Sequence, residues 1–476
     1  MKLKQLVGEI AGSLADVEIT SLTCDSRKVE KGSLYVCIDG VFVDGHKFAA
    51  DAVNKGAAAV VCEKDLGLNN QIKVDNTRKW FSVLCSNWFG CPSKSMKIIG
   101  ITGTNGKTST AFMIKTILEK NGYKVGLVGT IQNMVGNEVI ETSTTTPDSY
   151  ELQSVFSKMK DAGCDYCVME VSSHALDQYR VYGVEFEVGI FTNLTQDHLD
   201  YHKTMENYLL AKKKLFSASK TAIINKDDEA FEVLTKDLNC NLKSYSLIDK
   251  SADYFAEDID YRSDGVGYTL CVDDFSDRID MSTGGKFTVY NSMCSTACAI
   301  ELGIEKQASV RTISSLSGVK GRAEVVPTGR DYTMIIDYAH TPDGLENILK
   351  TFKDCPKNRL IALFGCGGDR DRTKRPKMGE VAARLSDYMI ITSDNPRSED
   401  PDKIIEDIIE GVKNYDTPYT VITNRIEAIK FAVKNAQKGD IVVLAGKGHE
   451  TYQILKDKTI HLDEREVISE ALKETE

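Results

Sequence analysis

The sequence predicts an α/β protein of three domains, with a doubly wound, mostly parallel sheet in the central one. Three observations predict this class. The 476 residues are too many for one hydrophobic core. Apolar strand segments alternate with helical segments along most of the chain. A glycine-rich turn that ends in Gly-Lys-Thr stands between an early strand and the helix after it. The expected domains are an N-terminal α/β domain at 1–94, a central domain at 95–320 and a Rossmann-like domain at 321–476.

The expected strands follow one another in a regular order. In the first domain they are 33–38 and 57–62, and residues 91–94 are expected to link this domain to the next. In the central domain they are 97–99, 124–128, 166–171, 188–192 and 221–224, with a helix at 109–120. Polar alternation over 249–287 predicts β-hairpins added to that domain. In the last domain the strands are 333–336, 359–364, 388–392 and 440–444, separated by helices.

The most informative segment is the glycine-rich turn at 100–108, which reads Gly-Ile-Thr-Gly-Thr-Asn-Gly-Lys-Thr. A strand, a turn of this kind and a helix are the setting in which backbone N–H groups and a helix N-terminus bind phosphate. We expect Lys107 to contact the β- and γ-phosphates of a nucleotide, and the hydroxyl of Thr108 to bind Mg²⁺. The loop is a short form of the general pattern, because Ile101 stands where an earlier Gly is usual. The alternative is a glycine-rich turn with a chance Lys-Thr pair.

The net charge and the cysteine spacing exclude several classes of function. A net charge of −11 argues against a general nucleic-acid or membrane binder. Thirteen scattered cysteines do not form a disulfide framework. The Cys164-x-x-Cys167 pair runs into a strand, which disfavours a redox or zinc role and favours reduced thiols. We expect no signal peptide, no membrane insertion and a cytoplasmic protein, because Glu9 and Asp16 interrupt any apolar N-terminal region.

Candidate metal ligands lie where strands of the central domain end. Glu170 closes one strand and His198 follows another, and open α/β sheets bind ligands at strand C-termini. The alternatives are a capping or surface role for Glu170 and a structural zinc pair of His198 with His202. The run 212–214, Lys-Lys-Lys, would ordinarily be a solvated helix face.

Three loops of mixed charge follow strands of the last domain. They are 365–372 with Arg370, 393–399 with Arg397, and 445–450. Two arginines at adjacent strand ends form a good bidentate site for a carboxylate. Surface turns with solvated charges are the alternative. The convergence of three such loops suggests a zwitterionic substrate such as an amino acid.

These motifs together resemble the Mur ligases, the ATP-dependent amide-forming enzymes of peptidoglycan precursor synthesis. The matching motifs include Cys-Asp-Ser-Arg at 24–27, Asp-Gly-His at 44–46, Thr-Thr-Pro-Asp at 145–148, Glu-Val-Ser-Ser-His at 170–174, the stretch 192–202, Tyr-Leu-Leu-Ala-Lys at 208–212, Gly-Arg-Ala-Glu at 321–324, 337–343, 365–370, Asp-Asn-Pro-Arg at 394–397 and 446–450. One departure is Thr144, where some relatives have Asn. The resemblance implies that the first domain binds the UDP part of a nucleotide substrate, the central phosphate-loop domain binds ATP, and the third binds an amino acid.

The resemblance also implies a role for individual residues. The residues implied to bind ATP are Gly103, Thr104, Asn105, Gly106, Lys107, Thr108, Ser109, Asn291, Arg322, Asp337 and His340. Those implied to bind a UDP-muramoyl dipeptide are Ser26, Thr145, Thr146, Ser172, Gln178 and Arg180. Those implied to bind diaminopimelate are Arg370, Asp394, Asn395, Pro396, Arg397, Gly446 and Glu450. The implied Mg²⁺ ligands are Thr108, Glu170, His198 and Lys212, the last as a carbamate; the implied catalytic residues are Lys107, Lys212, His198 and Glu170.

The resemblance implies a ligase that adds meso-2,6-diaminopimelate to UDP-N-acetylmuramoyl-L-alanyl-D-glutamate, with ATP and Mg²⁺ as cofactors. Its diaminopimelate enzymes carry the Arg of Asp-Asn-Pro-Arg, and its lysine enzymes replace it. A lysine-adding ligase, a phosphate-loop regulator that binds nucleotide without ligation and a folate-type polyglutamate ligase remain as alternatives. We expect a monomer that binds small molecules only.

Overall fold

The computed structural model describes residues 1–40, 43–142, 144–262, 265–316, 318–353 and 355–474. The chain divides into two compact units, Met1–Lys243 and Ser244–Glu476, and each is described by itself. The three-domain boundaries at 94/95 and 320/321 stay predictions.

The first unit begins with a small parallel sheet in the order β1-β2-β3-β4. Apolar side chains of the central strands, such as Leu34 and Val61, are buried against Phe81 and Leu84 of the helix α3. The expected strands 33–38 and 57–62 are confirmed with shorter bounds. The elements of this part are α1 (Leu3–Val7), β1 (Ser21–Thr23), β2 (Ser33–Val36), α2 (Ala49–Asn54), β3 (Ala59–Cys62), β4 (Gln71–Lys73) and α3 (Thr77–Trp88), with 3₁₀ helices at Gly8–Leu14 and Gly45–Phe48.

A larger sheet follows, with the order β11-β10-β5-β9-β6-β7-β8 within the first unit. It is parallel from β11 to β6, and β7 and β8 form an antiparallel edge. Its elements are β5 (Lys97–Thr102), α4 (Lys107–Lys120), β6 (Val125–Val128), β7 (Asn133–Val135), β8 (Glu138–Ile140), α5 (Ser149–Asp161), β9 (Tyr166–Glu170), α6 (Ser173–Asp177), β10 (Phe186–Phe191), α7 (Leu199–His202), α8 (Met205–Lys213), β11 (Ser219–Asn225) and α9 (Phe231–Thr235). The expected linker 91–94 largely coincides with a 3₁₀ helix, Pro92–Ser95, and its role as a linker stays a prediction.

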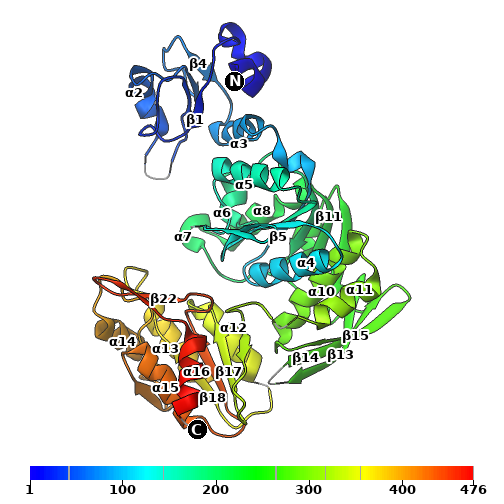
Figure 1. The fold of residues 1–476 in the computed structure, drawn as a ribbon, viewed down its shortest axis with the longest axis vertical. Helices are drawn as coiled ribbons and strands as arrows, with labels where there is room; N and C mark the ends of the chain where they lie inside the picture. The colour runs from blue at the N-terminus through cyan, green and yellow to red at the C-terminus, as the bar shows by residue number, and fades with distance from the viewer. Residues whose placement is uncertain (41–42, 143, 263–264, 317, 354, 475–476) are drawn as a thin grey trace. The chain divides into compact units, whose positions relative to one another are not determined.

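The strand order of this sheet positions a site. Strand β5 lies between β10 and β9, although the chain passes from β5 to β6 first. The carboxyl ends of β5, β9 and β10 are therefore neighbours at a point where the strand order reverses, which is where open α/β sheets bind ligands. Figure 1 shows α5 and α4 on opposite sides of β5, so helices cover both faces as the alternating sequence predicts.

The second unit contains two parts. Strand β12 (Asn241–Ser246) runs into it, and β13 (Tyr254–Arg262), β14 (Gly265–Val272) and β15 (Phe275–Met281) form antiparallel hairpins, as the polar alternation predicts. The helices α10 (Lys286–Glu301) and α11 (Lys306–Ser314) follow. Then comes a sheet in the order β16-β17-β21-β18-β19-β20, parallel except for β16.

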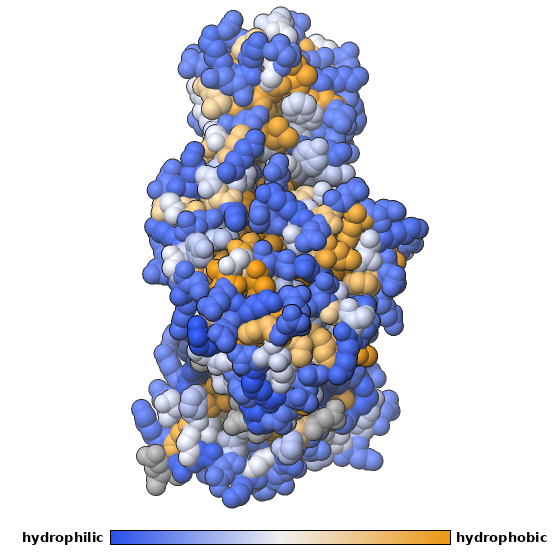
Figure 2. All heavy atoms as spheres, turned by 90° about the vertical axis from the view of Figure 1, so that its right-hand side faces the viewer, coloured by the Kyte–Doolittle hydropathy of each residue, from blue (hydrophilic) through white to orange (hydrophobic). Residues whose placement is uncertain are grey.

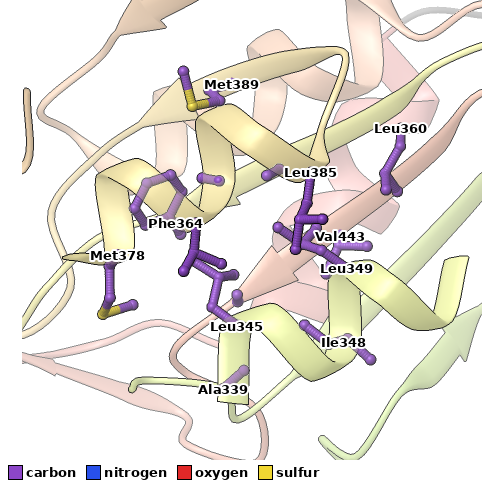
Figure 3. Close-up of a cluster of buried hydrophobic side chains, with 14 of the residues drawn as sticks. Ala339, Leu345, Ile348, Leu349, Leu360, Phe364, Met378, Leu385, Met389 and Val443 are labelled. Carbon is purple, nitrogen blue, oxygen red and sulfur yellow. The ribbon is translucent and has the colours of Figure 1, made fainter. Parts of the chain in front are cut away.

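The elements of that last sheet are β16 (Glu324–Val326), β17 (Thr333–Asp337), α12 (Pro342–Lys353), β18 (Leu360–Phe364), α13 (Lys374–Leu385), β19 (Tyr388–Ile391), α14 (Pro401–Glu410), β20 (Tyr419–Val421), α15 (Arg425–Asn435), β21 (Ile441–Ala445), the hairpin β22 (Tyr452–Ile454) and β23 (Thr459–His461), and α16 (Glu464–Glu474). Buried side chains of α12, α13 and α14 cover one face, and those of α15 and α16 cover the other. Figure 3 shows Leu345 of α12 and Met378 of α13 among the buried side chains that pack with Phe364 of β18. Because β18 lies between β21 and β19, the loops after these three strands are neighbours.

The surface of the protein and its cysteines bear on membrane insertion and on disulfide bonds. Hydrophilic residues cover most of the face in Figure 2, with apolar residues in separate groups between them. No helix in the described part of the chain is long and apolar enough to cross a membrane. All thirteen cysteines are free thiols, and Cys164 and Cys167 are buried.

Candidate active site

The glycine-rich turn stands at the carboxyl end of β5, as the sequence predicts. Gly103 has a φ of +148°, and a Cβ there would lie 1.9 Å from the Thr192 hydroxyl, so no other residue fits. Gly106, at φ +85°, is the N-cap of α4, and Ser109 lies in the first turn of that helix. The ammonium of Lys107 donates to the Gly103 carbonyl at 2.9 Å, across the mouth of the turn. The turn therefore has the geometry of a phosphate-binding loop.

Residues after β10 brace this loop. The backbone N–H groups of Thr104 and Asn105 donate to the carbonyl and side-chain oxygens of Asn193, at 2.8 and 2.9 Å. The hydroxyl of Thr192 donates to the Asn105 carbonyl at 2.6 Å. Asn193 lies in the expected motif 192–202. Its contact with the loop joins segments that are far apart in the chain, so the sequence did not predict it.

Glu170 is the buried centre of an oxygen-rich cluster. Its carboxylate accepts hydrogen bonds from the Thr108 hydroxyl at 3.0 Å and from the backbone N–H and hydroxyl of Thr130, both at 2.9 Å. Gly129 allows this approach, because a Cβ there would lie 2.5 Å from a Glu170 oxygen. A carboxylate beside a hydroxyl suits Mg²⁺, which prefers oxygen ligands. Sequence reasoning missed Thr130, which carries no motif of its own.

Lys212 is buried, with 1 % of its surface exposed. Burial, assisted by the nearby charge of Lys107, holds the pKa of the Lys212 ammonium well below its usual range. Its Nζ lies 4.2 Å from the ring centre of Tyr208. A neutral amine in a dry pocket is the form that reacts with CO₂, so these surroundings suit the carbamate that the resemblance implies. Lys214, by contrast, forms an exposed ion pair with Asp177.

His198 starts the short helix α7 with a left-handed φ of +52°. Its ring lies 4.8 Å from the ring of His174 and 6.0 Å from that of Tyr208. His202 is turned into the protein and shares a hydrogen bond with the Ser173 hydroxyl at 2.9 Å. The described residues hold no group of three or more His, Cys, Asp or Glu side chains that could bind a metal, so the alternative of a zinc pair gains no third ligand.

Four of the residues expected to bind the muramoyl dipeptide form one hydrogen-bonded cluster, and a fifth, Thr145, joins it through Thr130 and Glu170. The Arg180 guanidinium donates to the Thr146 carbonyl and the Gln178 side chain, both at 2.8 Å. The Thr146 hydroxyl accepts from the Ser172 backbone N–H at 3.0 Å, and the Thr145 hydroxyl pairs with that of Thr130. Ser26 lies elsewhere, in the loop after β1, where its carbonyl accepts from Lys55. Within the described ranges, no hydrogen bond joins Ser26 to the other five.

In the second unit the structure brings the two expected arginines together. A Cβ on Gly367 would lie 2.9 Å from a guanidinium nitrogen of Arg397 and 3.8 Å from the Cγ of Arg370. Arg397 has a left-handed φ of +52° and donates to the Gly368 carbonyl at 2.8 Å. A Cβ on Gly368 would meet the Pro396 carbonyl at 1.9 Å, so the two loops pack without side chains between them. Both side chains therefore approach Gly367 at this edge of the sheet, and a carboxylate-binding fork of Arg370 and Arg397 stays a prediction.

A cluster of charged side chains lies in the adjoining loops. The Asn395 amide donates to Glu450 at 3.0 Å, and the buried ammonium of Lys447 donates to the same carboxylate oxygen at 2.6 Å. A Cβ on Gly446, whose φ is +118°, would lie 2.5 Å from an Asp394 carboxylate oxygen. Nothing in the sequence pointed to a role for Lys447, although Lys447 lies between the candidates Gly446 and Glu450.

The remaining candidates for ATP binding belong to the second unit. The Arg322 guanidinium lies 5.0 Å from the centre of the Tyr338 ring. The Asp337 carboxylate accepts from the backbone N–H groups of Ala323 and Ala339 at 2.7 and 2.8 Å, and burial raises its pKa. His340 also contacts Tyr338, and Asn291 is buried in α10. These roles stay predictions.

The fold and the two groups of loops define a ligase built on a phosphate-loop α/β sheet and a second doubly wound sheet. The family models of the "Mur ligase family, catalytic domain", the "Mur ligase middle domain" and the "Mur ligase, glutamate ligase domain" match residues 18–88, 101–299 and 321–448. The chain is 50% identical to the UDP-N-acetylmuramoyl-L-alanyl-D-glutamate–2,6-diaminopimelate ligase 1 of Clostridium acetobutylicum over 100% of both proteins. The chain belongs to the Mur ligase family.

Solved structures agree with this assignment. A UDP-N-acetylmuramoyl-L-alanyl-D-glutamate–2,6-diaminopimelate ligase is 34% identical, with a TM-score of 0.74 over 100% of this chain and 99% of the other. The folylpolyglutamate synthase of Mycobacterium tuberculosis is 16% identical, with a TM-score of 0.61 over 82% of this chain and 93% of the other. The second likeness shows a shared fold alone. The expected three-domain α/β fold class is therefore confirmed.

Proposed function

We propose that this ligase uses ATP to join the amine of meso-2,6-diaminopimelate to the free γ-carboxylate of UDP-N-acetylmuramoyl-L-alanyl-D-glutamate. The observation that carries this proposal is that two arginines and the carboxylates of Asp394 and Glu450 lie in neighbouring loops at one sheet edge. Arg370 and Arg397 meet at Gly367, and Asn395 and Glu450 are hydrogen-bonded in the adjoining loops. A diamino diacid has a carboxylate for the first group and an amine for the second. The name of the Clostridium relative supports the same substrates.

The reaction would proceed in two steps. The γ-carboxylate of the D-Glu residue attacks the γ-phosphate of ATP, so that a C–O–P bond forms and ADP leaves. The α-amine of diaminopimelate then attacks the acyl phosphate, an amide bond forms, and inorganic phosphate leaves with the electrons of the broken C–O bond. Lys107 and the N–H groups at the start of α4 would stabilise the charge of the transferring phosphoryl group.

The donor set around Glu170 fits Mg²⁺. The carboxylate of Glu170 and the hydroxyl of Thr108 already face one another, and His198 and the carbamate of Lys212 would complete the ligands. A bound Mg²⁺ neutralises phosphate charge in reactions of this class. Carbamylation turns the buried amine of Lys212 into an anion, which gives this pocket a second negative group for the metal.

The muramoyl dipeptide would bind in the first unit. The residues expected to bind it lie beside Glu170, because the Thr146 hydroxyl donates to the Glu170 carbonyl at 2.9 Å. They are Thr145, Thr146, Ser172, Gln178 and Arg180. The peptide acid would therefore lie beside the phosphate-binding loop. Ser26 would contact the distant UDP end, which explains why it shares no hydrogen bond with the cluster.

Specificity for diaminopimelate over lysine would come from the fork. Lysine lacks the second carboxylate, so it leaves two guanidinium groups without an anion. Arg370 is exposed and Arg397 is half-buried, so the loss of this partner costs less than it would at a fully buried site.

The decisive experiment measures ADP release from the purified chain with ATP, Mg²⁺ and each substrate alone or together. We expect ADP only when the muramoyl dipeptide and diaminopimelate are both present, with an amide product of matching mass. ADP formation with lysine and not with diaminopimelate would make the chain the lysine-adding ligase. Nucleotide binding without any ADP release would make it a regulator that does not ligate.

A further inference from the structure

A buried ion pair lies beneath the loops of the amino-acid site. Arg425 begins α15 and Glu464 begins α16, and both side chains have 0 % of their surface exposed. The Arg425 Nε donates to the Glu464 Oε1 at 2.8 Å, and a terminal nitrogen of the guanidinium lies 2.7 Å from the same oxygen. Neither residue belongs to a motif that the sequence pointed to, and neither has been given a role above.

The other hydrogen bonds of Arg425 go to two loops of the site. One guanidinium nitrogen donates to the Ala445 carbonyl at 2.9 Å, and the other donates to the Ser393 carbonyl at 3.3 Å. Ala445 directly precedes Gly446, and Ser393 directly precedes Asp394. Ala445 ends β21 and Ser393 lies just after β19, and these two strands lie on either side of β18. A single planar side chain thus connects two loops across the end of a strand.

Stability alone does not account for this pair. Arg425, a cation in the first turn of α15, opposes the dipole of that helix, which offsets the favourable position of Glu464 in the first turn of α16. A fully buried ion pair costs desolvation energy that its mutual attraction only just repays. The Glu464 Oε2 is also buried without a hydrogen-bond partner among the described residues, which adds a further cost. An apolar pair of similar volume would stabilise this position at least as well.

We propose that Arg425 is a positioning residue for the amino-acid site, with Glu464 as the group that orients its guanidinium. Arg425 fixes the backbone of Ser393 relative to that of Ala445, and so sets the spacing between Asp394 and Gly446. This inference rests on the proposed function, because it treats those loops as the site of diaminopimelate.

An apolar double variant separates positioning from folding. Arg425→Met together with Glu464→Leu removes both buried charges at once, so we expect the protein to fold, with a thermal midpoint lowered only by the two loop carbonyls that lose their donor. It also removes both hydrogen bonds to the loop carbonyls. We expect the KM for diaminopimelate to rise about tenfold or more, since small displacements of a binding group have large kinetic effects. The KM values for ATP and the muramoyl dipeptide should stay within about twofold of the parent values. That is well below the roughly tenfold change in affinity that follows a loss of about 1.4 kcal/mol of binding free energy.

The matched control lies at the opposite ends of two of the same strands. Arg359 precedes β18 and pairs with the buried Asp440, which precedes β21. Arg359→Met breaks an ion pair of the same sheet, far from the loops, and it lowers the thermal midpoint without changing the KM for diaminopimelate. If the apolar double variant fails to fold, Arg425→Lys takes its place, because an ammonium keeps the charge beside Glu464 and cannot donate to both carbonyls.

Backbone hydrogen exchange provides a readout that needs no substrate. We expect amides of residues 393–395 and 445–450 to exchange faster in the apolar double variant than in the parent and in Arg359→Met. Unchanged exchange with an unchanged KM for diaminopimelate would overturn the positioning role. The parent protein could also prove unable to use diaminopimelate. Faster exchange in the double variant would then still support the positioning role, and only the proposed substrate would be refuted.

Discussion

The hydroxyl of Thr108 and the carboxylate of Glu170 are hydrogen-bonded at 3.0 Å, although 62 residues separate them in the chain. Thr108 opens the helix after β5, and Glu170 ends the neighbouring strand β9. This contact links the phosphate-binding loop to the candidate metal ligand. It also indicates which substitutions test the proposed chemistry.

The first prediction concerns Glu170→Gln, which preserves the shape of the side chain and removes its charge. Because the carboxylate is proposed to bind Mg²⁺, we expect kcat to fall about 100-fold or more and the Mg²⁺ concentration for half-maximal rate to rise. The measurement is ADP release over a Mg²⁺ titration. The control is Thr116→Val on α4, the helix of Thr108, because among the described residues its hydroxyl bonds to the Phe112 carbonyl and not to Glu170. An unchanged Mg²⁺ dependence would show that Glu170 is not a ligand.

The second prediction concerns Lys212→Ala. Because the buried amine is proposed to become a carbamate, its removal should abolish most activity, and added short carboxylates such as acetate or formate should restore part of it. The restoration is measured as ADP release against carboxylate concentration. Lys213→Ala is the matched control on the same helix, since Lys213 contacts only the backbone carbonyls of Val233 and Lys236. Loss of activity without any restoration counts against a carbamate.

The third prediction concerns Arg397→Ala. Removal of one arm of the fork should raise the KM for diaminopimelate by about 10- to 100-fold, the effect of about 1.4–3 kcal/mol from a bidentate contact. The KM for ATP should hardly change, and lysine should become a less disfavoured substrate. Arg384→Ala, which removes a partly exposed ion pair with Glu346, is the control. If the variant uses diaminopimelate as well as its parent does, Arg397 does not bind the second carboxylate.

The fourth prediction concerns acid stability. Arg375 hydrogen-bonds to Glu399 and lowers the pKa of that carboxyl from 4.5 to about 2. A carboxyl group with a depressed pKa contributes stability above its unfolded pKa and loses it as the pH falls through its folded pKa. The unfolded and folded pKa values of Glu399 set a window from about pH 5 to about pH 2. Within it, the thermal midpoint should fall more steeply in the parent than in Glu399→Gln.

The comparison for this fourth test is Glu410→Gln, which removes a carboxylate that pairs with Lys413 at the exposed end of α14. This variant should follow the parent curve over the same pH range, because exposed ion pairs contribute little. If the parent and Glu399→Gln also give parallel curves, the pair of Arg375 and Glu399 does not set the acid limit of the second unit.

Most of the fold was predictable from local sequence. Apolar runs predicted the strands that became β9, β10, β18, β19 and β21 within two residues at each end, because burial on both faces leaves a continuous apolar signature. The expected strand 97–99 ends three residues short of β5. The segment 91–94 shows the limit of such reasoning. Its Pro and Ser residues are typical of a linker, and the same residues also start a 3₁₀ helix. A short segment carries no periodicity that could separate the two.

The sequence by itself determined the family, the phosphate-binding loop and the two arginines, since each of these is written as a short motif beside a strand. Only the tertiary structure decided which groups accompany them. Thr130 reaches Glu170, and Arg425 reaches Ser393 and Ala445, across tens of residues of chain. The exposure of Lys212 differs from that of Lys214 for the same reason. Hydrogen bonds and burial of this kind depend on the order in which strands lie in a sheet, and no local pattern of side chains records that order.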